Sequence, residues 1–114
     1  MITGTGIDIV NIKRIKKSLS AYGDKFIKKI LSDKEIENIP AQKKEEFIAG
    51  RFAAKEALVK ASGVSLIFST ITILNDNDGK PCIIKLPDEI GKKKVHLSIS
   101  HDSDYAAAFV IIEK

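Results

Sequence analysis

The chain has 114 residues, of which 44% are hydrophobic and 30% are charged, and its net charge is +4 at pH 7. This balance predicts one globular domain over residues 1–114 and excludes a disordered chain. The single cysteine excludes a disulfide framework and a cysteine-rich zinc site. Because no apolar stretch reaches the ~18 residues of a membrane span and no secretory signal is present, we expect a cytoplasmic protein without membrane contacts.

Residues 1–10 predict a first strand in which a carboxylate interrupts an apolar run. Ile7 and Ile9 would share one face of this strand, and Asp8 would lie on the other. Aspartate is depleted in strands, so Asp8 needs a reason: it either caps the next helix or has a function. Asn11 is better placed as the helix cap, which favours the functional alternative.

Three short helices are expected next, over residues 11–22, 24–31 and 32–39. Ser32 and Glu35 have the spacing of a capping box at the start of the third helix. The first helix is amphipathic, and the residues expected to face the core are Ile12, Ile15, Leu19 and Tyr22. Its other face is basic, which indicates either an ordinary solvated surface or a docking surface for an acidic protein: Lys13, Arg14, Lys16 and Lys17.

A long helix is predicted over residues 45–63, since this segment is rich in helix-forming residues and contains no proline. It carries two apolar stripes at helical spacing. One stripe is bulky and consists of Ile48, Phe52 and Val59. The other contains only small residues, which let another backbone approach closely: Gly50, Ala53, Ala54, Ala57 and Ala61. Gly4 and Gly6 of the first strand likewise indicate a close backbone approach or a bulge.

Glu56 and Lys60 lie between these two stripes, at the edge of the expected buried surface. One interpretation is an i, i+4 ion pair that contributes about 0.2–0.5 kcal/mol. The alternative is a functional carboxylate, since a partly buried carboxylate needs a cation, a metal or several donors.

The second half of the chain changes to strands. We expect them at residues 69–75, 80–86, 95–100 and 105–112, with a turn at residues 76–79. The last strand is almost wholly apolar and is therefore predicted to be central. A strand, then helices, then a meander of strands predicts an α+β fold, in which an antiparallel sheet packs against one long and several short helices.

Three polar features then lie at the ends of buried elements: Asp8, the pair Glu56 and Lys60, and the turn at residues 100–102. Two carboxylates on rigid elements suit Mg²⁺, which keeps water molecules and substrate phosphate oxygens as its other ligands. A lysine one turn away from a carboxylate suits a phosphate group. The set predicts metal-assisted chemistry at a phosphate.

Three motifs together resemble one family, the holo-acyl-carrier-protein synthases, which are the small trimeric class of 4′-phosphopantetheinyl transferases. The motifs are GIDIV at residues 6–10, GRFAAKEALVKA at residues 50–61 and SISHD at residues 98–102. The likeness extends over essentially the whole chain and includes the order and spacing of the motifs. One departure is the segment after the long helix, residues 63–68, which is shorter and poorer in glycine than in the family.

The resemblance implies transfer of the phosphopantetheine arm of coenzyme A to a serine of an acidic apo acyl carrier protein, as a step of fatty acid biosynthesis. The implied Mg²⁺ ligands are Asp8 and Glu56, and Lys60 is the implied catalytic contact to the phosphates. The base that deprotonates the serine would be Glu56, a bound water or Asp8. The implied coenzyme A contacts are Arg51, Lys60, Gly63, Pro81, His101 and Asp102.

The resemblance also implies partners. The carrier protein would dock on the first helix, at Arg14 and its neighbours Lys13 and Lys17, and the active site would form between adjacent subunits of a homotrimer. Two rival hypotheses are an RNA-binding domain and an interaction module without catalysis. Against RNA binding, only 6% of the residues are aromatic and they do not alternate with basic residues. Retention of both acids argues against loss of catalysis.

Overall fold

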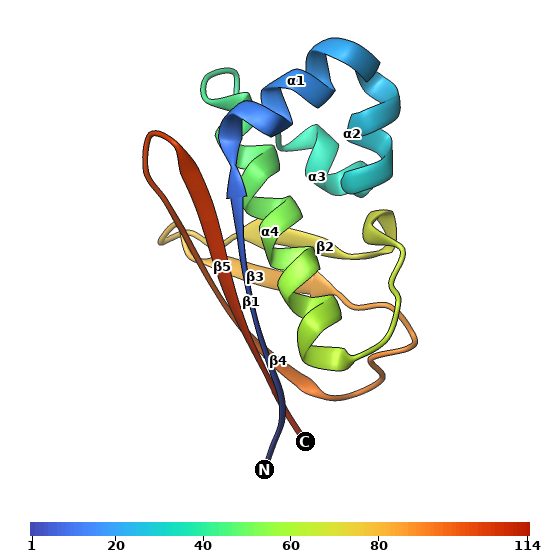
Figure 1. Cartoon of the computed structure of the whole chain (residues 1–114). Coiled ribbons are helices and arrows are strands. Elements are labelled where there is room, and N and C mark those ends of the chain that lie inside the picture. The colour runs from blue at the N-terminus through green and yellow to red at the C-terminus, as the bar shows by residue number, and fades with distance from the viewer.

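The computed structural model describes residues 1–114 as two antiparallel sheets, one long helix and three shorter ones (Figure 1). The larger sheet has the strand order β1-β5-β4, and the smaller sheet is the hairpin β2-β3. The strands are β1 (Ile2–Asn11), β2 (Thr72–Asn75), β3 (Pro81–Lys85), β4 (Lys94–His101) and β5 (Tyr105–Glu113). The predicted α+β class is confirmed, and β5 is the central strand of the larger sheet, as predicted.

The helices begin and end at the signals in the sequence. They are α1 (Ile12–Tyr22), α2 (Asp24–Ile30), α3 (Asp33–Glu37) and α4 (Lys44–Ser62). The Asn11 side chain caps α1 by accepting a hydrogen bond from the Lys13 backbone N–H at 2.9 Å. Gly63 ends α4 with a φ of +73°, a left-handed conformation that glycine adopts at little cost.

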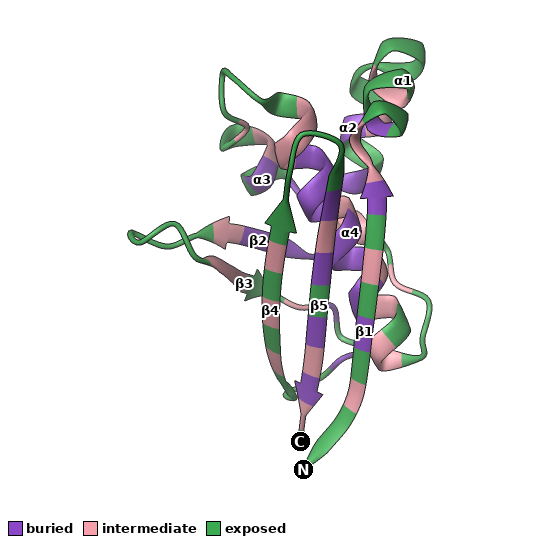
Figure 2. Ribbon diagram, turned by 60° about the vertical axis from the view of Figure 1, so that its left-hand side comes forward, coloured by how far each residue is buried: buried purple, intermediate pink, exposed green.

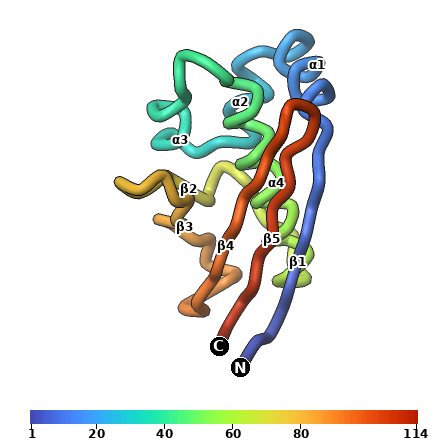
Figure 3. Tube along the Cα trace, turned by 90° about the vertical axis from the view of Figure 1, so that its left-hand side faces the viewer, coloured from blue at the N-terminus to red at the C-terminus, as the bar shows by residue number.

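The core lies between α4 and one face of the larger sheet, and α1 to α3 cover the upper end of this layer (Figures 1 and 3). Eighteen buried apolar residues form one cluster there. Figure 2 shows the alternation of buried and exposed positions along β5, which is typical of a sheet with one covered face. None of the helices combines the length and the apolar character that a membrane span requires.

The small-residue stripe of α4 packs directly on β1, as its composition predicts. A Cβ atom added to Gly6 would lie 1.9 Å from the Ala57 carbonyl oxygen, and one added to Gly4 would lie 1.9 Å from the Ala61 carbonyl oxygen. The two alternatives predicted for the β1 glycines, a close backbone approach and a bulge, are both found. The β1-β5 register shifts between Ile2 and Gly4. The backbones of α4 and β1 are therefore too close for any side chain to fit between them at Gly4 and Gly6.

The opposite face of the larger sheet is uncovered, and it is apolar along parts of β1 and β5. Ile7 and Ile9 of β1 are 65% and 66% exposed, although they alternate with the inward-facing Asp8 as predicted. Phe109 pairs across the sheet with Ile7, and the neighbouring Tyr105 is also exposed. The larger sheet thus has one face in the core and one apolar face without a partner in the single chain.

Two local predictions were wrong. Tyr22 is exposed rather than inward, because it is the last residue of α1 and precedes the turn at Gly23. The strand expected from Ser69 begins only at Thr72, since Phe68–Thr70 form a short 3-10 helix. The turn is closed by backbone bonds from Thr70 and Ile71, and the Lys55 ammonium group also donates to the Phe68 carbonyl oxygen at 3.0 Å.

The expected continuous meander was also wrong, because β3 does not pair with β4. Residues 86–93 between them are too long for a hairpin turn. They include Pro87, which has no N–H to donate to a strand ladder, and Gly91 at a φ of +69°. The chain therefore leaves the small sheet before it enters the large one.

We predict that Gly6→Ala destabilises the fold by roughly 3 kcal/mol or more, because the new methyl group meets backbone atoms that cannot rotate away. Chemical denaturation followed by circular dichroism measures this. Thr5→Ala is the matched control: Thr5 is the neighbouring exposed residue, so we expect a change within about 0.5 kcal/mol. Equal stability of the two variants would contradict the close packing of β1 on α4.

Candidate active site in two parts

The first part of the site lies at the β1 edge of the larger sheet. The Lys60 ammonium group on α4 lies 3.2 Å from Asp8 Oδ1 and donates to the Ile7 carbonyl oxygen at 2.8 Å. The Asp8 side chain is 17% exposed and that of Lys60 is 53% exposed, so the pair is open to a ligand. Two of the three predicted catalytic residues, Asp8 and Lys60, are thus in contact although they are far apart in the sequence.

Glu56 lies one helical turn before Lys60, on the same flank of α4, and Gly63 follows at the end of the helix. The ion pair between Glu56 and Lys60 is not formed, because Lys60 turns to Asp8 instead. No three His, Cys, Asp or Glu side chains gather closely enough to hold a metal ion by themselves. A donor set of two carboxylates fits Mg²⁺ rather than a metal that needs a complete protein cage.

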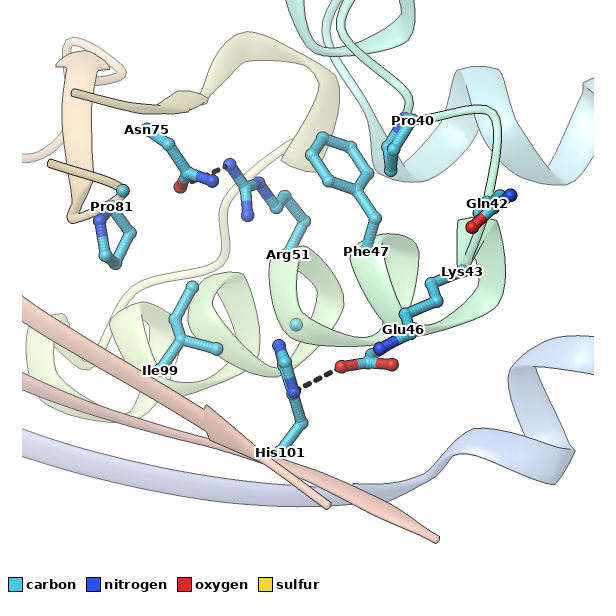
Figure 4. A pocket seen from close by; sticks show the side chains of 12 residues that line it. Pro40, Gln42, Lys43, Glu46, Phe47, Arg51, Asn75, Pro81, Ile99 and His101 are labelled. Atoms are coloured by element: carbon cyan, nitrogen blue, oxygen red, sulfur yellow. Dashed lines mark hydrogen bonds and ion pairs between the residues drawn. The ribbon is translucent and has the colours of Figure 1, made fainter. Parts of the chain in front are cut away.

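The second part is a pocket of about 310 Å³ at the β4 edge, between α4 and the β2-β3 hairpin (Figure 4). It brings together three of the residues predicted to contact coenzyme A, namely Arg51, Pro81 and His101. The other residues that line it are Pro40, Gln42, Lys43, Glu46, Phe47, Gly50, Asn75, Gly79 and Ile99.

Arg51 is held by several contacts at the wall of this pocket. Its Nε and Nη2 donate to the Ile73 carbonyl oxygen at 3.3 and 3.1 Å, and Nη2 also donates to Asn75 Oδ1 at 3.2 Å. The guanidinium carbon lies 4.2 Å from the centre of the Phe47 ring. Burial lowers the pKa of Arg51, and the Glu35 carboxylate opposes this effect. The arginine is therefore a fixed cation at the pocket surface.

The Nη1 group of Arg51 is the part left for a ligand. Nη1 has no hydrogen-bond partner in the protein, whereas every buried side-chain nitrogen or oxygen has one. Nη1 is therefore not buried. Because Arg51 lines the pocket, its two free N–H groups suit a phosphate in that space.

His101 and Asp102 behave differently although they are adjacent in the sequence. His101 Nδ1 pairs with Glu46 Oε1 of α4, and both residues line the pocket (Figure 4). Asp102 does not line it: its Oδ1 accepts from the backbone N–H groups of Asp104 and Tyr105, at 2.8 and 2.9 Å. These bonds lower the pKa of Asp102. In the single chain Asp102 therefore fixes the β4-β5 turn.

The two parts do not meet within one chain. Arg51 and Lys60 are about two and a half turns apart, so they point to opposite sides of α4. α4 crosses the sheet obliquely, since Ala61 lies on β1 while Gly50 meets Ile99 of β4. β1 and β4 are the two edges of this sheet, and each edge therefore carries one part of the site.

The predicted docking residues form a third group near the β1 end. Arg14 and Lys17 line a shallow groove beside α1, whose floor contains the apolar residues Val10, Phe26 and Phe52. Val10 is two residues after Asp8, so the groove is close to the first part of the site. Lys13 lies instead at a second, more open hollow of α1, together with Lys16 and Lys17.

Several of the pocket residues were not singled out from the sequence, among them Phe47, Glu46 and Asn75. Phe47 carried a signal, since its i, i+4 spacing to Arg51 allows a cation–π contact. Glu46 and Asn75 carried none, because their partners His101 and Arg51 lie in distant segments. Only the fold brings these pairs together.

Comparison with known proteins shows the family. The family model of the 4′-phosphopantetheinyl transferase superfamily matches residues 4–110. The chain is 44% identical to a holo-(acyl-carrier-protein) synthase of Maridesulfovibrio salexigens, with 100% of both chains covered. It is 48% identical to the protein of the same name from a Wolbachia of Drosophila simulans, with 98% of each covered.

Solved structures of such synthases have the same fold. The holo-(acyl-carrier-protein) synthase of Neisseria meningitidis superposes with a TM-score of 0.91 at 39% identity, with 100% of both chains covered. The Bacillus anthracis enzyme, solved in complex with coenzyme A (3′,5′-ADP), superposes with a TM-score of 0.84 at 42% identity, with coverage of 99% of this chain and 97% of that one.

Proposed function

The chain belongs to the 4′-phosphopantetheinyl transferase superfamily, and we propose that it transfers the phosphopantetheine arm of coenzyme A to a serine of an acyl carrier protein, releasing 3′,5′-ADP. The single observation that carries the proposal is the similarity over the full chain to synthases of this reaction, one of them solved with coenzyme A. The Asp8–Lys60 contact and the Arg51 pocket agree with it.

Asp8 and Glu56 are the residues that would hold Mg²⁺ in this reaction. Both are carboxylates on rigid elements. Asp8 on β1 contacts Lys60, and Glu56 lies one turn before Lys60 on α4. When bound, the ion supplies positive charge that offsets the charge developing on the leaving group. Substrate phosphate oxygens and water would complete its ligands, which agrees with the presence of only two acids.

Lys60 would bind the phosphate oxygens of coenzyme A. Its ammonium group has three donors, and two of them are used by Asp8 and the Ile7 carbonyl oxygen. Since the side chain is half exposed, the remaining donor faces the space where a ligand would approach. The base that accepts the serine proton would be Glu56, a bound water or Asp8.

The pocket at the β4 edge would hold the nucleotide part of coenzyme A. Arg51 offers two free N–H groups to a phosphate, and Phe47 and Pro81 give the pocket apolar walls. His101 completes the lining together with Glu46. Within one chain Asp102 would act only indirectly, by fixing the turn that follows His101.

We predict that an apo acyl carrier protein gains the mass of one phosphopantetheine arm when it is incubated with this protein, coenzyme A and Mg²⁺. Intact-mass spectrometry measures the gain, and EDTA should abolish it. Asp8→Ala and Glu56→Ala should each lower the rate at least about a hundredfold, because charge stabilisation at the phosphate is lost.

These two variants should remain folded: the Asp8–Lys60 pair is partly exposed, and pairs near the surface contribute only about 0–1 kcal/mol, while Glu56 forms no ion pair in the chain. Circular dichroism provides this control. Turnover close to that of the unmodified protein from either variant would refute the metal assignment. A folded protein that modifies no carrier protein would refute the proposed function.

We further infer that the protein works as a homotrimer with its sites between subunits. One chain carries the Asp8 part at its β1 edge and the Arg51 part at its β4 edge. A head-to-tail ring joins unlike edges of neighbouring chains, and three such contacts close it. The exposed apolar face around Ile7, Ile9 and Phe109 provides the surface that such an assembly would bury.

We predict that Phe109→Asp dissociates the assembly and abolishes transfer, because it buries a charge in an apolar contact. Sedimentation equilibrium measures the assembly state. Ile84→Asp on β3 is the matched control, since it also places a charge at an exposed apolar residue but lies outside the larger sheet and the docking groove. A Phe109→Asp variant that stays trimeric, or that is fully active as a monomer, would contradict the proposed interface.

The groove beside α1 is the proposed docking surface for the acidic carrier protein. Arg14 and Lys17 supply positive charge above its apolar floor, and Lys13 extends this charge along the helix. Such charge raises the rate of association more than it raises affinity. We propose the cytoplasm as the compartment, where an unpaired thiol such as that of Cys82 stays reduced.

We predict that Arg14→Glu raises the KM for the carrier protein about tenfold and leaves the KM for coenzyme A unchanged. Steady-state kinetics at low and high salt measures both constants. Lys28→Glu makes the same change of charge on the exposed face of α2 and should have little effect. Equal effects of the two variants would show that net charge alone, and not docking on α1, governs carrier binding.

A further inference from the structure

A buried ion pair lies outside both parts of the site. The side chains of Lys55 on α4 and Glu35 on α3 are each 0% exposed, and the Lys55 ammonium group contacts Glu35 Oε1. Two buried charges are costly unless each is paired and hydrogen bonded. Nothing in the proposed transfer uses either residue, so the pair needs an explanation of its own.

Lys55 has all of its donors satisfied. Besides Glu35, its ammonium group binds the Ile30 carbonyl oxygen at 2.8 Å and the Phe68 carbonyl oxygen at 3.0 Å. These two carbonyl groups end α2 and open the 3-10 helix at Phe68. Burial lowers the pKa of Lys55, and Glu35 opposes this effect.

Glu35 connects this group to β2. Its Oε1 also accepts from the Ser32 backbone N–H at 2.8 Å, as the predicted capping box requires. Its Oε2 accepts from the Ile73 backbone N–H at 3.0 Å. Thr72, next to Ile73, donates its hydroxyl to Ser32 Oγ at 2.8 Å. α3 and β2 are therefore joined by hydrogen bonds rather than by apolar contact alone.

Ile73 is the residue that leads to the nucleotide pocket. Its N–H is bound by Glu35, and its C=O accepts both bonds from Arg51. In an antiparallel strand the N–H and C=O of one residue point to the same edge. Glu35 and Arg51 thus occupy the free edge of β2, the place that another strand would take.

We propose that the Glu35–Lys55 pair positions Arg51 by fixing the free edge of β2. The inference rests on the proposed function, in which Arg51 binds the nucleotide part of coenzyme A. If Ile73 shifts, Arg51 loses its anchor, and Asn75 two residues later moves with the same strand. Glu35 and Lys55 are positioning residues, because neither lines the pocket.

A double substitution can remove the contact to Ile73 without a large loss of stability. Replacing both members of a buried ion pair by apolar side chains of similar size is often neutral for stability. It nevertheless removes the acceptor for the Ile73 N–H. A glutamine at position 35 keeps one oxygen for this N–H, while its NH₂ group replaces the oxygen that accepts from the Ser32 N–H, so it restores the Ile73 contact but not the capping box.

The test compares E35M/K55M with E35Q/K55M in the full-length protein. We expect E35M/K55M to raise the KM for coenzyme A about tenfold, since it loses one buried hydrogen bond of the Arg51 support. Its kcat and its KM for the carrier protein should stay within about twofold. E35Q/K55M should lie closer to the unmodified protein. Thermal unfolding confirms that both variants are folded.

Glu35→Asp provides a second variant in case neither double variant folds. It keeps a charge opposite Lys55 but shortens the side chain by one methylene, so it withdraws from the Ile73 N–H, and the KM for coenzyme A should rise. An unchanged KM in E35M/K55M, or in Glu35→Asp where only that variant folds, would overturn the positioning role. So would equal losses in both double variants, or a loss confined to kcat.

The failure of this inference can be told apart from failure of the proposed function. If the unmodified protein transfers the arm and E35M/K55M has the same KM for coenzyme A, only the positioning role is wrong. If the unmodified protein binds no coenzyme A and modifies no carrier protein, the function itself is wrong, and with it the role of Arg51 on which the inference depends.

Discussion

The close approach of β1 to α4 is the constraint on which the rest of the structure depends. Gly6 and Gly4 leave no room for a side chain against the carbonyl groups of Ala57 and Ala61. Because the two backbones are in contact, the lysine one turn along the helix reaches Asp8 and the carbonyl group before it. The first part of the site is thus a consequence of backbone packing, which explains why small residues form a stripe on an otherwise ordinary helix.

The same helix also divides the site. α4 begins near β4 and the hairpin and ends on β1, so its functional residues face opposite edges of one sheet. A long substrate that needs both a phosphate-binding arginine and a metal-binding pair would require two chains. The uncovered apolar face of the sheet offers the surface on which those chains would meet. The fold, the proposed assembly and the proposed chemistry therefore depend on one oblique crossing of helix and sheet.

Much of this could be predicted from the sequence because its signals are local. Helix caps at Asn11 and Ser32, the glycine end of α4 and the apolar character of β5 each depend on residues close in the chain. Asp8 is a functional candidate because a carboxylate is unusual in a strand. These signals gave the fold class, and with the family resemblance they gave the candidate residues.

The rest could not be predicted, because it depends on pairs between distant segments. Lys55 lies at helical spacing within the bulky stripe of α4, but no local signal shows that Glu35 and the Phe68 carbonyl group are its partners. His101 was expected beside Asp102, but its ion-pair partner is Glu46 and Asp102 caps its own turn. The length of residues 86–93 argues against a hairpin between β3 and β4, but only the fold shows that these strands belong to different sheets. Local periodicity predicts which face of an element is buried, whereas only the fold shows which residues that face contacts.

The most direct test of a site divided between chains is to mix two inactive variants. Asp8→Ala damages the β1 part, and Arg51→Gln damages the β4 part of the same chain. Subunits exchanged at equal amounts in a random trimer should rebuild about a quarter of the sites from undamaged parts. Carrier-protein modification should then return to about a quarter of the original rate. A mixture no more active than its separate components would contradict the account.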